Sequence, residues 1–156
     1  MTQDPNEQAD TPPLRDRIAN GAFLALMRLA QALPYHRRIA LMGWLFAHVL
    51  APAAGWRKRI RQNLALACPD LDPAEVRRLE RAVPDNAGRS LAETYSGEAF
   101  SARIRTRDPF IGPGLPALEE VARTGRPVVL ASAHFGNYDA MRAAMRARGW
   151  PVGGLY

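Results

Sequence analysis

Hydrophobic and polar positions follow a helical period along the first third of the chain. Apolar residues recur every three or four positions between Leu14 and Leu33, and Pro34 ends the run, which predicts an amphipathic helix. A second segment, Ile39–Ala54, is almost wholly apolar. As a helix it would be roughly 24 Å long, short of a bilayer's apolar thickness of about 30 Å. A clean transmembrane span is therefore not expected from this segment.

The rest of the chain alternates helical patterns with short apolar or β-branched runs. Asp72 before Pro73 is typical of a helix N-terminus, Pro84 is expected to break that helix, and Asp85 is expected to cap the next one. The pattern predicts helices over 73–82, 85–100, 115–123 and 138–148, and strands over 103–108, 128–133 and from Val152 onward. A buried strand followed by a helix indicates a β-α unit, so the expected fold class is α/β, a sheet with flanking helices.

Three regions follow from these patterns. Residues 1–13 are polar, contain three prolines and are expected to form a disordered leader without the features of a signal peptide. Residues 14–55 are expected to form a membrane-associated helical segment, and residues 56–156 the α/β domain.

Charge adds an expectation about partners. The chain has 21 basic and 15 acidic residues, a formal charge of +6; beyond residue 13 the counts are 21 and 12, which gives +9. Lys58 is the single lysine, so nearly all the cations are guanidinium groups, which match phosphate oxygens in bidentate geometry. A GC-rich genome would also explain the arginine bias. Cys68 is the only cysteine, which excludes an internal disulfide and a cysteine metal cluster.

A tryptophan and a group of cations follow the apolar segment directly. These residues are Trp56, Arg57, Lys58, Arg59 and Arg61. An aromatic ring flanked by cations suits the headgroup region of an anionic membrane, where each cation contributes about 1 kcal/mol. The alternative is that the apolar helices form the buried hairpin of a soluble domain, with the cations on its solvated face.

Candidate catalytic groups lie in the segment HFGNYD, after the predicted strand 128–133. His134 carries a side chain whose usual pKa suits proton abstraction near neutral pH, and Asp139 could hold one ring nitrogen. Gly136 would let the backbone approach a substrate, and Asn137 is a favourable N-cap. The bland alternative is a structural hydrogen bond at a strand-to-helix turn.

HFGNYD resembles the H-x4-D/E motif of glycerolipid acyltransferases, and specifically the HFGNWE-like form of the late acyltransferases of lipid A biosynthesis. Three other segments are similar to that family in the same order, namely 57–69, 88–93 and 125–130. The resemblance runs from about residue 18 to residue 156. It implies a glycerolipid-acyltransferase-like sheet, of which this chain would hold the amino-terminal half and so be incomplete at the C-terminus.

The resemblance also implies a reaction. His134 would be the general base, Asp139 would orient it, and Phe135, Gly136 and Asn137 would shape the substrate pocket. The reaction would move a fatty acyl group from acyl carrier protein to a hydroxyl of a lipid A precursor, at the cytoplasmic face of the bacterial inner membrane. No metal or organic cofactor is implied. The sequence departs from the usual motif at two positions, with Tyr138 in place of tryptophan and Asp139 in place of glutamate.

A further candidate binding group is Arg103, Arg105 and Arg107, which would alternate onto one face of the predicted strand 103–108. There they would contact phosphate or the acidic carrier protein, or simply form a solvated face. Two other functions stay open: an acyltransferase acting on another membrane lipid, and a non-catalytic basic module that binds an anionic membrane or nucleic acid. The chain has no zinc-ligand pattern, RNP-like aromatic pair or convincing helix-turn-helix, so a nucleic-acid partner is not expected.

Overall fold

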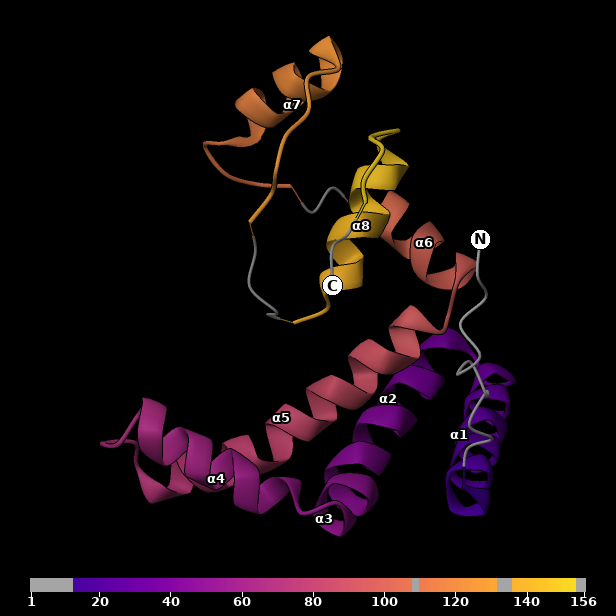
Figure 1. Ribbon diagram of the computed structural model, residues 1–156, viewed down its shortest axis with the longest axis vertical. Coiled ribbons are helices and arrows are strands. Elements are labelled where there is room, and N and C mark those ends of the chain that lie inside the picture. Colours follow the sequence, from indigo (N-terminus) through magenta and orange to yellow (C-terminus); the bar gives the residue numbers. More distant parts are fainter. Residues whose placement is uncertain (1–12, 108–109, 132–135, 154–156) are drawn as a thin grey trace, which may run out of the picture.

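The computed structural model describes residues 13–107, 110–131 and 136–153, and this part of the chain is helical throughout, with loops and turns between the helices (Figure 1). The helices are α1 (Leu14–Gln31), α2 (Tyr35–Leu45), the π-helical turn η1 (Phe46–Leu50), α3 (Ala51–Ala53), α4 (Trp56–Ala67), α5 (Pro73–Thr94), α6 (Glu98–Arg105), α7 (Leu115–Thr124) and α8 (Tyr138–Ala147). The predicted helices over 14–33, 115–123 and 138–148 are confirmed as α1, α7 and α8.

The main core lies between α1, α2 and α5. Its buried members are Met27 and Ala30 of α1, Ile39 and Met42 of α2, and Ala92 of α5. Met42 is completely buried. Partly buried side chains close the edges of this core: Phe23, Leu26, Tyr35, Leu45, Phe46 and Leu91. The helical period of α1, α2 and α5 thus places an apolar stripe of each of these helices against the other two.

Two glycines allow α2 and α5 to approach closely. A Cβ atom added at Gly88 would collide with the backbone oxygen of Met42 and with the Phe46 ring, and one added at Gly43 would collide with Asp85 and Arg89. At Gly88 an added Cβ would push the two helices apart because it meets backbone, whereas at Gly43 the Asp85 and Arg89 side chains would have to move.

The apolar segment 39–54 is not one straight helix. It runs through α2, η1 and α3, and the π-helical turn precedes Pro52, which has no N–H to donate to the preceding turn. Gly55 then takes a left-handed conformation with φ of 72°, and the chain bends by 90° into α4. No single helix among the described residues is long and apolar enough to cross a membrane. Tyr35–Ala53 and Trp56–Ala67 meet the length and composition criteria only as a bent pair.

A second group of helices lies at the far end of α5 (Figure 1). Helix α6 packs on α8. Phe100 of α6 and Ala144 and Met145 of α8 are buried. Helix α7 has no buried residue, and an ion pair of 2.9 Å between Glu119 and Arg148 is one of its links to the segment after α8.

The predicted α/β fold is wrong for the described residues, which contain no strand and no sheet. Residues 103–105 belong to α6, because a helix starts after Gly97 and continues through the short β-branched alternation. Residues 128–131 have no regular structure, Val129 is 94% exposed, and no strand among the described residues pairs with this apolar run. Residues 132–133 lie outside the described part, and Val152 lies in irregular chain.

The predicted helix break at Pro84 is also wrong. Helix α5 continues from Pro73 to Thr94 with Pro84 inside it, and the proline ring is completely buried. A proline inside a helix removes one backbone hydrogen bond, and burial of the ring against neighbouring helices offsets that loss. The start of α5 follows the prediction, since the Asp72 side chain accepts a hydrogen bond of 2.6 Å from the Ala74 amide.

Candidate active site

The start of α8 is fixed by residues of the motif HFGNYD. Gly136 has a φ of 64°, a left-handed conformation that favours glycine, and it turns the chain into the helix. Asn137 is the N-cap, and its side-chain oxygen accepts a hydrogen bond of 3.1 Å from the Asp139 amide. The predicted capping role of Asn137 is therefore confirmed.

The C-terminal end of α5 holds this cap in place. The Asn137 side-chain amide donates a hydrogen bond of 2.8 Å to the Glu93 carboxylate, and the Thr94 hydroxyl donates one of 2.9 Å to Oδ2 of Asp139. Two consecutive residues of α5 therefore bind two residues of the motif. Thr94 thus orients the Asp139 side chain, although the two residues are 45 positions apart in the sequence.

Glu93 also connects the motif to the main core. The Tyr35 hydroxyl, at the start of α2, donates a hydrogen bond of 3.4 Å to the other oxygen of Glu93. Burial and the neighbouring Glu93 carboxylate raise the pKa of Tyr35, so its hydroxyl stays protonated and remains a donor at neutral pH. A continuous polar contact thus runs from α2 through α5 to the cap of α8.

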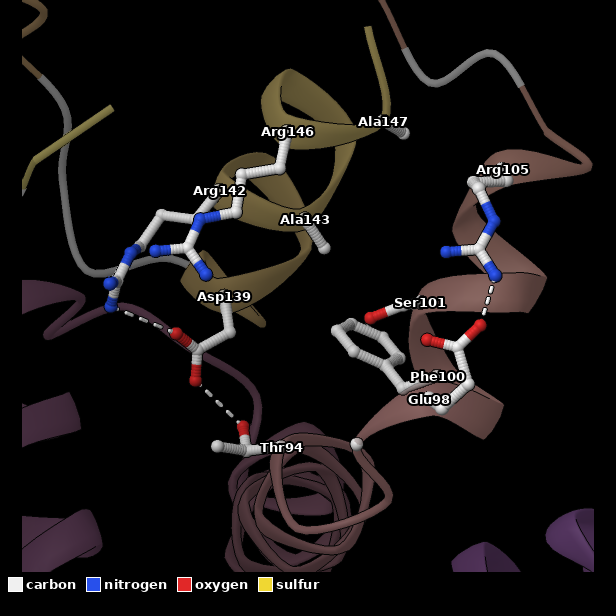
Figure 2. A pocket seen from close by; sticks show the side chains of 11 residues that line it. Thr94, Glu98, Phe100, Ser101, Arg105, Asp139, Arg142, Ala143, Arg146 and Ala147 are labelled. Carbon is white, nitrogen blue, oxygen red and sulfur yellow. Dashed lines mark hydrogen bonds and ion pairs between the residues drawn. The ribbon is translucent and has the colours of Figure 1, made fainter. Parts of the chain in front are cut away.

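A pocket of about 420 Å³ opens beside Asp139, between α6 and α8 (Figure 2). Arg142 and Arg146 of α8 line one side, Ser101 and Arg105 of α6 line the other, and Thr94 lies at its base. Asp139 is about one-fifth exposed through its side chain, and its Oδ1 lies 3.5 Å from the Arg142 guanidinium. The pocket is therefore lined by a carboxylate held in place by hydrogen bonds, by several arginine side chains and by hydroxyl groups.

A comparison with known protein families identifies the family of the chain. The family model described as bacterial lipid A biosynthesis acyltransferase matches residues 15–156. The chain belongs to this family. The resemblance that the sequence motifs indicated is thereby confirmed, and membership makes the chain an acyltransferase of lipid A biosynthesis with a lipid acceptor. Neither the curated proteins nor the solved structures gave a match.

Two of the motif's predicted residues, His134 and Phe135, lie outside the described residues. Of the pair of residues predicted to form the dyad, the structure describes Asp139. A carboxylate has about four acceptor positions, and Thr94 and Arg142 account for two of those on Asp139.

The three arginines predicted to share one strand face do not share a face. Because α6 is helical, Arg103 and Arg105 point in nearly opposite directions around it. Arg103 lies 5.5 Å from the centre of the Tyr35 ring, whereas Arg105 pairs with Glu98 and lines the pocket. Arg107 follows the helix and is exposed. Only Arg105 of the three therefore lies in the site.

The residues predicted to meet a membrane lie on α4 and have mixed surroundings. Trp56 is half-buried and packs edge-on against Phe46, with ring centres 6.2 Å apart, and Arg57 is also half-buried. Lys58 and Arg59 are exposed. Arg61 binds Glu80 of α5 at 2.7 Å, and this hydrogen bond holds the pKa of the buried Glu80 below its usual range. Arg61 thus joins α4 to α5.

Sequence reasoning missed the residues that surround Asp139. Glu93 was not predicted to contact the motif, although it lies in the segment 88–93 that resembles the family. Nothing in the spacing of Thr94, Arg142 and Arg146 pointed to a pocket, since it depends on how α5, α6 and α8 meet. Among the described residues, no group of three or more histidine, cysteine, aspartate or glutamate side chains could hold a metal ion.

Proposed function

We propose that this chain transfers a fatty acyl group from the thioester of acyl carrier protein to a hydroxyl of a lipid A precursor. His134 takes the proton from the hydroxyl as its oxygen attacks the thioester carbonyl, and Asp139 orients the imidazole and stabilises its protonated form. The carbon–sulfur bond then breaks, and His134 returns the proton to the departing thiolate. In this scheme every bond and proton is accounted for without a metal or organic cofactor.

The observation that carries this proposal is the placement of Asp139. Its carboxylate is held by Thr94 at the edge of a pocket, and it keeps acceptor positions for an imidazole N–H. The shorter side chain of aspartate, compared with the usual glutamate of the family motif, requires His134 to come closer. The basic body of the chain, with +9 beyond residue 13, favours encounter with an acidic carrier protein.

The reaction is proposed to occur at the cytoplasmic face of the inner membrane. Leu14, Ile18 and Leu29 of α1 are 63–71% exposed and fall within an arc of roughly 60° on the helix, on the side away from the buried residues Met27 and Ala30. Such an apolar stripe suits insertion among lipid chains. The exposed cations of α4 would add attraction to anionic headgroups.

Activity measurements with substitutions at the dyad test the chemistry. In the full chain, His134→Ala is expected to lower turnover by about 10²–10⁴-fold, the range for loss of a general base. Asp139→Asn should also lower it, whereas Asp139→Glu, which restores the common family residue, should retain measurable activity. Asp70→Asn, an exposed aspartate outside the site, is the matched control. A folded His134→Ala protein with the original transfer rate would contradict the proposal.

The acceptor and the membrane are tested separately. Transfer to the lipid A precursor should exceed transfer to phosphatidylglycerol supplied at the same concentration; the reverse order would assign another lipid acceptor. Co-sedimentation with anionic liposomes should occur at low salt and weaken at high salt, because exposed charges are screened. The Ile18→Ser, Leu29→Ser double variant should bind less. A chain that stays in the supernatant at low salt would contradict the membrane proposal.

A further inference from the structure

The pocket beside Asp139 contains more positive charge than the proposed proton transfer uses. Three guanidinium groups line it, those of Arg105, Arg142 and Arg146, together with the hydroxyls of Ser101 and Thr94. Arg142 and Arg146 come from successive turns of α8, whereas Arg105 lies on α6, where it points toward Glu98 (Figure 2). Cations and hydroxyl groups from three helices, α5, α6 and α8, therefore line one pocket.

The acidic residues of the pocket neutralise only part of this charge. Glu98 pairs with Arg105, and Asp139 lies 3.5 Å from Arg142. Within the described chain, the Arg146 side chain makes no ion pair and no hydrogen bond, and it is exposed. Three cations against two carboxylates leave a surplus of one positive charge, located at Arg146.

The shape of the pocket also suits a ligand group. Its volume of about 420 Å³ lies in the range of small-molecule sites. Ala143 and Ala147 present small side chains toward it from α8, and the largely buried Phe100 supplies an apolar wall. The small alanine side chains leave room in the pocket for a ligand group.

We propose that this pocket binds a phosphate group carried by one of the two substrates, with Arg146 as its main cationic contact. A guanidinium fork matches two phosphate oxygens, and hydroxyl groups can donate to the others. Because Asp139 lines the same pocket, a phosphate bound there would hold the rest of its substrate beside the proposed dyad. The positioning role rests on the proposed function, but the binding itself can be measured without turnover.

The phosphate could belong to a phosphorylated sugar of the acceptor or to the phosphopantetheine arm of the donor. Glucose 1-phosphate and pantetheine 4′-phosphate serve as probes for the two sources, and glucose and pantetheine are their phosphate-free controls. Dissociation constants are measured with the full chain by calorimetry at low ionic strength. We expect both phosphate-free compounds to bind at least ten-fold more weakly than their phosphorylated forms, and the tighter phosphorylated probe identifies the substrate concerned.

Two variants test the location of the site by different means. Arg146→Gln removes the surplus charge, and Ala147→Leu fills the space while keeping every charge and a good helix former. Each should weaken binding of the tighter probe by at least ten-fold. Arg123→Gln, on α7 outside the pocket, removes the same charge from the surface and should leave binding unchanged. Circular dichroism confirms that the variants are folded.

The failure of this inference can be told apart from failure of the proposed function. If Arg146→Gln and Ala147→Leu bind the probe as tightly as the original chain, or if the phosphate-free compounds bind equally well, the phosphate site is wrong even where His134→Ala abolishes transfer. If His134→Ala retains full transfer while both pocket variants lose binding, the phosphate site stands and the dyad is wrong.

Discussion

Helix α5 makes two kinds of contact with the rest of the chain. Over much of its length α5 packs against α2 through Gly43 and Gly88, around a core of apolar side chains shared with α1. At its C-terminal end it meets the start of α8 through the polar contacts of Glu93 and Thr94. Apolar burial thus dominates the first region, whereas hydrogen bonds of partly exposed groups hold the second.

This difference separates stability from function along one helix. Burying a large apolar side chain stabilises a fold by about 1.5–3 kcal/mol, whereas one hydrogen bond contributes a net 0.5–1.5 kcal/mol. Substitutions in the core should therefore affect unfolding of the whole chain. Substitutions at the pocket should act on ligand binding and on local order around α8, which is the property a substrate site needs.

The largest effect is expected from a cavity in the core. Met42→Ala removes a completely buried side chain and should lower the free energy of unfolding by about 2–5 kcal/mol. Leu118→Ala, on α7 where no residue is buried, should cost less than about 1 kcal/mol. Urea unfolding followed by circular dichroism measures both. Equal losses would mean that α7 contributes as much apolar burial as α2, against the structure.

The next largest effect concerns the close approach of two helices. Gly88→Ala should destabilise the chain by about 1–3 kcal/mol, because its Cβ would meet the Met42 backbone and force α2 away from α5. Gly21→Ala, on the exposed side of α1 with no atom near the added carbon, should instead stabilise by up to about 1 kcal/mol through helix propensity. If both substitutions stabilise, the two helices do not pack as closely as the structure has them.

The same contrast explains which elements the sequence could predict. Helices α1, α7 and α8 and the start of α5 follow from local signals: an apolar period, a cap or a terminal glycine. The run 128–131 looks like a buried strand by composition, but a strand needs a neighbouring strand, and no local pattern supplies one. Pro84 misled the prediction for the opposite reason, because tertiary burial of its ring outweighs a local preference.

The candidate site was predictable only in part. Asn137 and Asp139 were found because they share a short motif with each other, and the resemblance to a family gave that motif a meaning. Arg146 could not be found this way, since its relation to Arg105 depends on how α6 packs against α8. The arginine triplet 103–107 was assigned one face because a strand period was assumed, and a helical period separates its members.

A smaller effect is expected where the second region joins α5. Asn137→Ala removes the cap of α8 and the hydrogen bond to Glu93, and it should cost about 1 kcal/mol. Asn137→Ser keeps a capping oxygen, so it should restore most of the cap. It cannot reach Glu93 as the amide does, so that hydrogen bond should stay lost. Hydrogen exchange of the α8 amides measures the local loss. Unchanged exchange in the alanine variant would show that the cap does not order this helix.

The smallest effect is expected from the ion pair between Arg61 of α4 and Glu80 of α5, which lies away from the pocket. The Arg61 hydrogen bond lowers the pKa of Glu80 in the folded chain. The ionised Glu80 therefore stabilises the fold at any pH above the usual glutamate pKa near 4.5, and this stabilisation is lost as the pH falls through the lowered pKa. Glu80→Gln should therefore destabilise by roughly 1 kcal/mol or less at pH 7, and the difference from the original chain should shrink below pH 4. Urea midpoints at pH 7, 5 and 3.5 measure this. Glu75→Gln, which breaks a more exposed pair with Arg78, is the control and should show a smaller difference. A Glu80→Gln difference that stays constant with pH would mean that the Arg61 contact stabilises the fold independently of the charge on Glu80.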